Sequence, residues 1–320
     1  MRVAVTGGSG FIGSHVVDKL VESDHDVVVV DPSRPHRDDV EHVAADILDL
    51  EGMVAALDGV ETVFHLAAVA DVNVANGDPS RAVELTVLGT SRVWEAARVC
   101  GVGRSILAST VWVYGAAFGA EPMTEESAFQ PSRVTHVYTA AKLACEMIVH
   151  ATHSLYGQDF TILRYGVPYG ERMRAELVIP RFVRQVLDGR PITLHGDGSQ
   201  HRNYVYVGDL ADAHVLALGS AANGRVFNLE GVEPISLRSL VDALAALLDR
   251  SVPLTFEAPR PGDYAAPEVS SALAAEVLGW SPSTSFAVGL RRYVDWYIEQ
   301  DTRSMPPFSM EVGGGAAAAR

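Results

Sequence analysis

The glycine-rich stretch at residues 7–13 is the feature that most constrains what this chain can fold into. It reads Gly-Gly-Ser-Gly-Phe-Ile-Gly and follows residues 2–6, a β-branched run typical of a strand that is buried on both faces. Residues 14–23 then show helical periodicity, and residues 26–30 form a second apolar run that ends at Asp31. A strand, a glycine turn, a helix and a strand that ends on an acid predict a dinucleotide-binding unit.

Each glycine of this turn has a separate physical role. Gly7 permits the tight turn, Gly10 lets a pyrophosphate approach the backbone, and Gly13 lets the helix pack close to the strand. The helix N-terminus offers free N–H groups and a partial positive charge to the phosphates. Asp31 would accept hydrogen bonds from both adenosine ribose hydroxyls, which favours NAD over NADP, although Arg34 nearby weakens this preference slightly.

Strands and helices keep alternating along the chain. Strands are expected at residues 40–44, 62–66, 104–108 and 191–194, and helices at 50–57, 78–100, 136–150, 177–187, 210–220, 236–248, 271–278 and 286–300. The helix at 78–100 would begin from an Asp-Pro pair, with Asp78 as its N-cap. This pattern predicts an α/β fold, a Rossmann doubly wound parallel sheet with a smaller α/β C-terminal substrate domain.

The composition excludes several classes of partner. The chain has 25 Lys and Arg against 40 Asp and Glu, and its net charge of -15 argues against nucleic acid and anionic membranes. Cys100 and Cys145 lie in apolar helical surroundings and are expected to be buried thiols in a reducing compartment. No His/Cys spacing indicates zinc, no apolar run reaches ~18 residues, and a strand begins at residue 2. We therefore expect a cytoplasmic protein without a metal ion.

Three side chains are candidates for acid–base chemistry. Tyr138 and Lys142 are four residues apart in a helical run, so they share one face, and the ammonium is expected to lower the pKa of the phenol. Such a tyrosine can act as a general base toward a hydroxyl group, although this spacing also occurs on purely structural helices. Thr110 follows the strand expected at 104–108, where parallel sheets bind ligands. Its hydroxyl could bind a substrate oxygen, the Tyr138 phenol or its own backbone.

Taken in order, these motifs resemble the extended short-chain dehydrogenase/reductase family. More narrowly, the chain resembles the NAD-dependent nucleotide-sugar epimerases and dehydratases of the UDP-glucose 4-epimerase type. The resemblance runs from about residue 2 to about residue 297. The motifs are residues 6–13, 65–68, 109–110 with 113–115, Tyr138 with Lys142, 163–165, 169–170, 196–200, 202–211 and 260–263.

The fold and the resemblance together imply a set of cofactor contacts. Asp46 and Ile47 would flank the adenine, and the small Ala67 and Ala68 would let the dinucleotide pass over the strand ends. Lys142 would hold the phenolate of the tyrosine and bind the nicotinamide ribose. The complete set expected for NAD is Gly7, Gly10, Phe11, Ile12, Gly13, Asp31, Asp46, Ile47, Leu66, Ala67, Ala68, Tyr138, Lys142 and Tyr165.

The resemblance also implies five contacts to a nucleotide-sugar substrate. Thr110 would orient the reacting hydroxyl, and Arg202 and Arg260 would hold the diphosphate, for which the fork of a guanidinium is suited. Val167 stands where the family carries an asparagine, so the grip on the substrate should differ from that of common galactose epimerases. Arg174 belongs to an Arg-x-Arg stretch that looks like one in UDP-uronate enzymes, where an arginine can meet a C6 carboxylate.

The residues after Thr110 narrow the reaction. The 4,6-dehydratases carry Asp and Glu where this chain has Val111 and Trp112, and neither side chain can move a proton. Dehydration is therefore set aside, and UDP-uronate decarboxylation, which uses a Glu at the position of Trp112, is weakened. The resemblance implies epimerisation of a UDP-hexose or UDP-uronate, favouring C4, through a transient 4-keto sugar. An NAD(P)-dependent 4-ketoreductase or dehydrogenase, and a non-catalytic NAD-sensing module, stay open as alternatives.

The expected organisation follows from these assignments. Residues 1–165 would form the NAD-binding domain, to which the chain returns around 203–230, and residues 166–310 would mainly bind the nucleotide sugar. Residues 311–320 are expected to be a disordered tail. The resemblance implies a homodimer through the helices at 80–100 and 138–156, whose apolar faces would also suit a monomer core.

Overall fold

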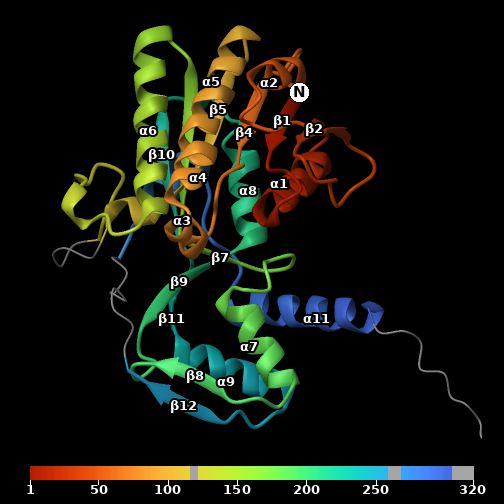
Figure 1. Cartoon of the computed structure of the whole chain (residues 1–320), viewed down its shortest axis with the longest axis vertical. Helices are drawn as coiled ribbons and strands as arrows, with labels where there is room; N and C mark the ends of the chain where they lie inside the picture. Colours follow the sequence, from red (N-terminus) through yellow and green to blue (C-terminus); the bar gives the residue numbers. More distant parts are fainter. Residues whose placement is uncertain (116–121, 259–267, 305–320) are drawn as a thin grey trace, which may run out of the picture.

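The computed structural model describes residues 1–115, 122–258 and 268–304 (Figure 1). The predicted Arg260 contact and the tail at 311–320 lie outside the described residues. A seven-stranded parallel sheet forms the larger part of the molecule, with the strand order β10-β6-β5-β4-β1-β2-β3. Its strands are β1 (Arg2–Thr6), β2 (Asp26–Val30), β3 (Glu41–Val43), β4 (Thr62–His65), β5 (Arg104–Thr110), β6 (Asp159–Tyr165) and β10 (Arg225–Leu229).

The order of these strands is that of a doubly wound sheet. The chain builds outward from β1 to β3, then restarts at β4 on the other side of β1. A topological switch point therefore lies between β1 and β4, where such sheets bind their ligands. The register pairs Thr6 with both Val30 and His65, so Gly7, Asp31 and the segment after β4 emerge at the same edge. The predicted Rossmann architecture is confirmed.

Helices cover both faces of the sheet (Figure 1). One face packs on α1 (Phe11–Glu22), α8 (Val207–Leu216) and α10 (Ala272–Leu278), and the other on α2 (Leu50–Ala56), α5 (Gly89–Val99) and α6 (Val137–Tyr156). Val3 and Val5 belong to the first core, and Ala4 belongs to the second. Apolar side chains on both faces explain why the β1 sequence lacks polar alternation.

A smaller unit lies beyond the carboxyl edge of the sheet, in the lower half of Figure 1. Strands β7, β9 and β11 form one small sheet, and β8 pairs with β12 in another. Its elements are β7 (Val167–Tyr169), α7 (Val178–Leu187), β8 (Ile192–His195), β9 (His201–Tyr206), β11 (Pro234–Ser236), α9 (Leu237–Leu248), β12 (Leu254–Glu257) and α11 (Phe286–Ser304). As the capping pattern predicts, the Ser236 hydroxyl accepts a 2.9 Å hydrogen bond from the Ser239 N–H at the start of α9.

The helix expected at 78–100 is not one continuous α-helix. Asp78 caps α4 (Pro79–Val83), but a π-helical segment, η1 (Glu84–Leu88), separates α4 from α5. The wider turn places the Thr86 hydroxyl 3.3 Å from the Val69 N–H, which donates to it. The sequence pattern also misses the strands β10, β11 and β12 and several short helical elements, which are α3 (Val72–Gly77), η2 (Val111–Tyr114), η3 (Pro131–Arg133) and η4 (Ser220–Ala222).

None of the helices within 1–115, 122–258 and 268–304 is both long and apolar enough to cross a membrane.

Candidate active site

The glycine turn between β1 and α1 is packed too tightly for side chains. Gly7 has a φ of 71°, and a Cβ atom there would lie 2.7 Å from the backbone nitrogen of Ala67. A Cβ atom at Gly13 would lie 2.0 Å from the Gly7 carbonyl oxygen. Both distances are shorter than real contacts, so the turn and the end of β4 can meet only because these residues are glycines. Gly10 is the N-cap of α1, and no side chain caps this helix end.

Asp31 lies beside this turn. Its Oδ2 atom accepts a 3.2 Å hydrogen bond from the Ser9 N–H, and its Oδ1 atom accepts one of 2.8 Å from the Ser33 N–H. An uncapped helix N-terminus offers donors to a diphosphate, and a carboxylate at the end of β2 offers acceptors to a ribose. The arrangement therefore fits a dinucleotide across the carboxyl edge of the sheet. Phe11 and Ile12, in the first turn of α1, are both partly buried at this edge.

The predicted adenine and strand-end contacts lie at the same edge. The Asp46 carboxylate accepts a 2.9 Å hydrogen bond from the Leu48 N–H, which fixes the loop after β3. Ile47 is only 7% exposed because it packs against Gly89, so most of its surface is already covered by protein. Leu66, Ala67 and Ala68 are each partly buried directly after β4.

Thr110 and Tyr138 come together at the end of β5. Thr110 is the last residue of β5 and is buried, and Tyr138 lies in the first turn of α6 and is half-buried. A hydrogen bond joins the two side chains. Residues 28 positions apart in the sequence thus place two hydroxyl groups at the binding edge of the sheet.

Lys142 does not have the predicted effect on Tyr138. Its ammonium donates a 2.8 Å hydrogen bond to the Ala108 carbonyl oxygen, and burial lowers the pKa of Lys142. Burial raises the pKa of Tyr138 to about 12, and the Thr110 hydrogen bond and the charge of Arg174 offset this only in part. The prediction that Lys142 lowers the pKa of the phenol was therefore wrong. Helical spacing places the two residues on one face, but burial outweighs the nearby charges.

A neutral histidine links the strands under the site. The His65 Nδ1 atom lies 2.7 Å from the Thr6 hydroxyl, and its Nε2 atom lies 2.9 Å from the Thr90 hydroxyl. Burial, followed by the charge of Lys142, lowers the pKa of His65 to about 3. The ring therefore stays uncharged at neutral pH and joins β1, β4 and α5 through its two nitrogens.

A cavity of about 430 Å³ adjoins the end of β5. Val167 and Arg202 from the predicted substrate set line it, together with Trp112. The Arg202 guanidinium lies over the Trp112 ring, 5.7 Å from its centroid. The cavity also contains Glu230, which the sequence analysis did not select. Its signal in the sequence is faint, since it is one acid that follows the apolar strand β10 and precedes a glycine.

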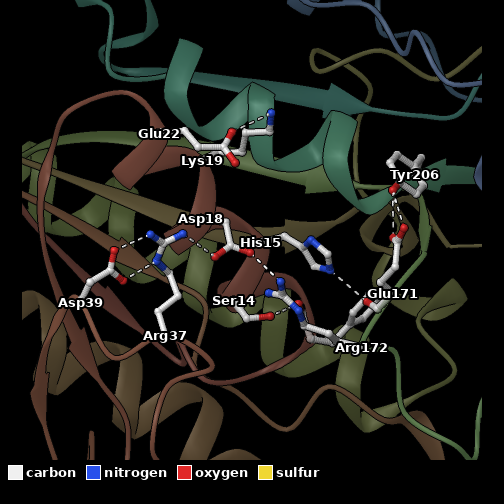
Figure 2. Close-up of polar contacts among 11 residues, drawn as sticks. Ser14, His15, Asp18, Lys19, Glu22, Arg37, Asp39, Glu171, Arg172 and Tyr206 are labelled. Carbon is white, nitrogen blue, oxygen red and sulfur yellow. Dashed lines mark hydrogen bonds and ion pairs between the residues drawn. The ribbon is translucent and has the colours of Figure 1, made fainter. Parts of the chain in front are cut away.

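The two arginines of the Arg-x-Arg stretch diverge. Arg172 has a φ of 63° and forms a 2.6 Å ion pair with Asp18 of α1, which also pairs with Arg37 at 3.2 Å (Figure 2). Arg174 instead donates a 3.1 Å hydrogen bond to the Ala70 carbonyl oxygen and pairs with Asp71 at 3.5 Å. Arg172 therefore ties the β7–α7 loop to α1 of the large sheet unit, while Arg174 lies close enough to lower the pKa of Tyr138.

Tyr165, predicted to contact NAD, lies in the core of the sheet. It is 5% exposed, and its hydroxyl forms a 2.7 Å hydrogen bond with the Nε2 atom of His214. Burial raises the pKa of Tyr165 well above its ordinary value. Because little of its surface remains open, any contact with a dinucleotide would require its side chain to move.

Comparison with known proteins agrees with this geometry. The family model described as "NAD dependent epimerase/dehydratase family" matches residues 3–229. A UDP-glucose 4-epimerase of Mycolicibacterium smegmatis is 36% identical over 313 residues, which cover 93% of this chain and 98% of the relative.

Two solved structures have the same fold. The UDP-glucose 4-epimerase of Thermotoga maritima, solved with UDP-glucose, superposes with a TM-score of 0.87 at 32% identity, covering 94% of this chain and 99% of its own. The dTDP-glucose 4,6-dehydratase DesIV of Streptomyces venezuelae, solved with NAD and TYD, also gives 0.87 at 30% identity, covering 95% and 98%. The chain therefore belongs to the NAD-dependent epimerase/dehydratase family, whose members act on nucleotide sugars, and its cofactor is NAD.

Proposed function

We propose that this enzyme epimerises a nucleotide-diphospho-sugar at C4 through a transient 4-keto sugar. The observation that carries the proposal is the hydrogen-bonded pair of Thr110 and Tyr138 at the carboxyl edge of the sheet, the edge at which the glycine turn after β1 also lies. A hydroxyl group of the sugar placed against this pair has a proton acceptor and an orienting group at one point. The adjoining cavity, lined by Arg202, has room and charge for the diphosphate and part of the sugar.

Each side chain has a stated role in this proposal. The glycine turn and Asp31 hold NAD, which supplies a reversible hydride acceptor when bound. Tyr138 takes the proton of the sugar hydroxyl, and Thr110 orients that hydroxyl. Because the phenol is protonated at neutral pH, Tyr138 reacts through its minor phenolate form, which Arg174 stabilises electrostatically. Lys142, whose ammonium donates to the Ala108 carbonyl oxygen, would bind the nicotinamide ribose.

The residues after Thr110 favour epimerisation over the alternatives. Val111 and Trp112 carry no group that can transfer a proton, so the end of β5 offers no acid for removing water. The Mycolicibacterium smegmatis relative is named a UDP-glucose 4-epimerase, which supports the same choice. Returning the hydride to the opposite face of the rotated keto sugar needs no additional acid. A 4-ketoreductase, a dehydrogenase or a UDP-uronate decarboxylase would carry the same tyrosine and lysine. The reaction products distinguish these activities from epimerisation.

The test is incubation with a panel of UDP-, dTDP-, GDP- and CDP-sugars, followed by NMR. Epimerisation gives an inverted centre with no net consumption of NAD, and the purified protein should keep NAD through dialysis and turn over without added cofactor. Loss of water, release of CO₂, or stoichiometric formation of NADH would each contradict the proposal. Tyr138→Phe is the matched control, since it removes only the reacting hydroxyl.

The position of Arg174 supports a uronate as one substrate class. Its guanidinium is 41% exposed and lies near Tyr138, where a C6 carboxylate could meet it. We expect Arg174→Ala to lower the turnover of a UDP-uronate more than that of a UDP-hexose. Arg172→Ala is the comparison variant, because that arginine pairs with Asp18 instead. Equal turnover of both sugars in the Arg174 variant would remove the uronate proposal.

An apolar outer face on η1 and α6 supports a homodimer. Leu88 is 42% exposed, Met147 66% and Leu155 71%, and exposed apolar side chains that gather on neighbouring helices are typical of a surface that a partner covers. A second copy of this chain, packed helix against helix, would bury them. Light scattering should give a dimer for the wild-type protein and a monomer for Met147→Glu. A wild-type monomer at micromolar concentration would contradict this assembly.

A further inference from the structure

Glu230 is a buried acid that the proposed chemistry at Thr110 and Tyr138 does not use. It directly follows β10, and its side chain is only 7% exposed. Its Oε2 atom has no hydrogen-bond partner among the described residues. A buried oxygen without a partner costs free energy, so its retention calls for an explanation such as a ligand.

The chain makes room for this carboxyl group with a glycine. A Cβ atom at Gly166 would lie 2.3 Å from the Oε2 atom and 2.9 Å from the Cδ atom of Glu230. Gly166 does not have a positive φ, so its backbone does not itself require glycine. On the other side, a Cβ atom at Gly231 would lie 1.9 Å from the Tyr204 carbonyl oxygen. Gly166 therefore leaves space for the carboxyl group, and the close approach of Gly231 to Tyr204 fixes the backbone that follows the acid.

Glu230 lines the same cavity as Trp112 and Arg202. Trp112 is two residues from Thr110, which orients the reacting hydroxyl, and Arg202 is the proposed diphosphate ligand. A nucleotide sugar held at both points would occupy this cavity and meet the acid. Resting on the proposed function, we infer that Glu230 is a specificity-determining residue, a protonated acid that donates a hydrogen bond to an oxygen of the bound nucleotide sugar.

The charge state of Glu230 agrees with this role. Burial raises the pKa of Glu230 to about 8, and the Gly231 N–H offsets this only in part. The other titratable groups that line the cavity in the described chain are His201, Arg202 and Glu268. Burial also raises the pKa of the adjoining Tyr204 to about 12, so that phenol stays neutral. A protonated acid can donate a hydrogen bond, which a carboxylate cannot, and it brings no negative charge toward the diphosphate.

The experiment is calorimetric titration of the full, NAD-loaded chain at pH 7 and pH 9. UDP-glucose is the first probe, replaced by the nucleotide sugar that the NMR panel identifies if that differs. An acid with a pKa of about 8 is protonated in only about one tenth of molecules at pH 9. The wild-type protein should therefore bind about tenfold more weakly at pH 9 than at the pH where the acid is fully protonated.

Three variants test whether the side chain of Glu230 causes this pH dependence of binding. Glu230→Gln keeps a hydrogen-bond donor but cannot ionise, so it should bind as the wild type does at pH 7 and lose the weakening at pH 9. Glu230→Ala should bind about three- to tenfold more weakly at pH 7, also without that weakening. Glu233→Gln removes an exposed acid three residues away and should keep the wild-type profile.

A second measurement changes Gly166, the residue that leaves space for the carboxyl group of Glu230. Gly166→Ala should displace the carboxyl group and weaken binding, and the same change in the Glu230→Ala background should cost less, which is a double-mutant cycle. Equal binding of Glu230→Ala and wild type at both pH values would overturn the inference alone. Normal binding but a hundredfold loss of turnover in Glu230→Gln would overturn it in favour of proton transfer. Failure of the wild type to bind any nucleotide sugar would overturn the proposed function first.

Discussion

The buried ion pair between Arg164 and Glu146 should control both the stability of the fold and the position of the proposed catalytic residues. The guanidinium donates to both carboxylate oxygens, at 3.0 and 2.7 Å, and the two side chains are only 3% and 2% exposed. Arg164 also donates to the Tyr114 hydroxyl at 2.6 Å, and Ser109 donates to Glu146. Ser109 precedes Thr110, so the pair joins β5, β6 and α6 directly under the site.

Glu146→Gln removes one charge at nearly constant shape. It leaves the Arg164 guanidinium buried without a counter-charge, and breaking a buried pair in this way costs about 3–5 kcal/mol of the free energy of unfolding. Because a chain of 320 residues loses about 1.5 °C of Tm per kcal/mol, we expect a fall of roughly 5–8 °C. Differential scanning calorimetry and urea unfolding followed by circular dichroism measure this directly.

A double-mutant cycle shows whether the lost charge is the cause. Glu146→Gln with Arg164→Met removes both charges, so it should be less destabilised than Glu146→Gln alone. The exposed pair of Asp188 and Arg190, which lie 2.8 Å apart and are 47% and 55% exposed, is the control, and Asp188→Asn should change stability by less than about 1 kcal/mol. A Glu146→Gln protein within 1 kcal/mol of the wild type would refute the reasoning.

Four further outcomes follow from the geometry of the site. Tyr138→Phe should lower kcat by about 10²–10⁴ with unchanged thermal unfolding, because it removes only the proton acceptor, as NMR turnover assays can show. Since the pKa of Tyr138 is raised to about 12, the phenolate fraction and therefore kcat should rise with pH through neutral into alkaline solution, and Arg174→Ala should move this rise to higher pH. Asp31→Ala should raise the Kd for NAD more than that for NADP, measured by fluorescence titration. Gly13→Ala should destabilise the fold and weaken NAD binding, because its Cβ atom would lie 2.0 Å from the Gly7 carbonyl oxygen, and an unchanged Tm would contradict that packing.

Local backbone geometry explains how much of the fold could be predicted. Gly7 has a positive φ and Gly13 packs on the Gly7 carbonyl, so the turn at residues 7–13 needs glycine for largely local reasons, and buried strands need apolar residues on both faces. The elements β1, β2 and α1 therefore follow from short stretches of sequence. The prediction for residues 78–100 fails at Thr86 because a π turn depends on partners from elsewhere in the chain. The Val69 N–H donates to the Thr86 hydroxyl, and Thr90 and Cys145 donate to its carbonyl oxygen.

The placement of the site was more predictable than its chemistry. In a parallel sheet every strand ends at the same edge, so residues that follow strands, such as Gly7, Asp31 and Thr110, gather there whatever their distance in sequence. The pKa of a side chain follows no such rule, because it depends on burial by residues from many segments. Lys142 therefore has the predicted position on α6 without the predicted effect on Tyr138.

Glu230 is a residue for which neither the position in the site nor the pKa could be predicted from the sequence. The residues next to Glu230 in the sequence do not indicate a special role. The space for its carboxyl group is left by Gly166, which directly follows β6, and the backbone after it packs against Tyr204 on β9. The glycine at position 166 thus leaves room for an acid 64 residues later in the chain. The burial of that acid raises its pKa, so it is mostly protonated at neutral pH. Such a pairing in the cavity wall lets substrate choice change without any change at Thr110, Tyr138 or Lys142.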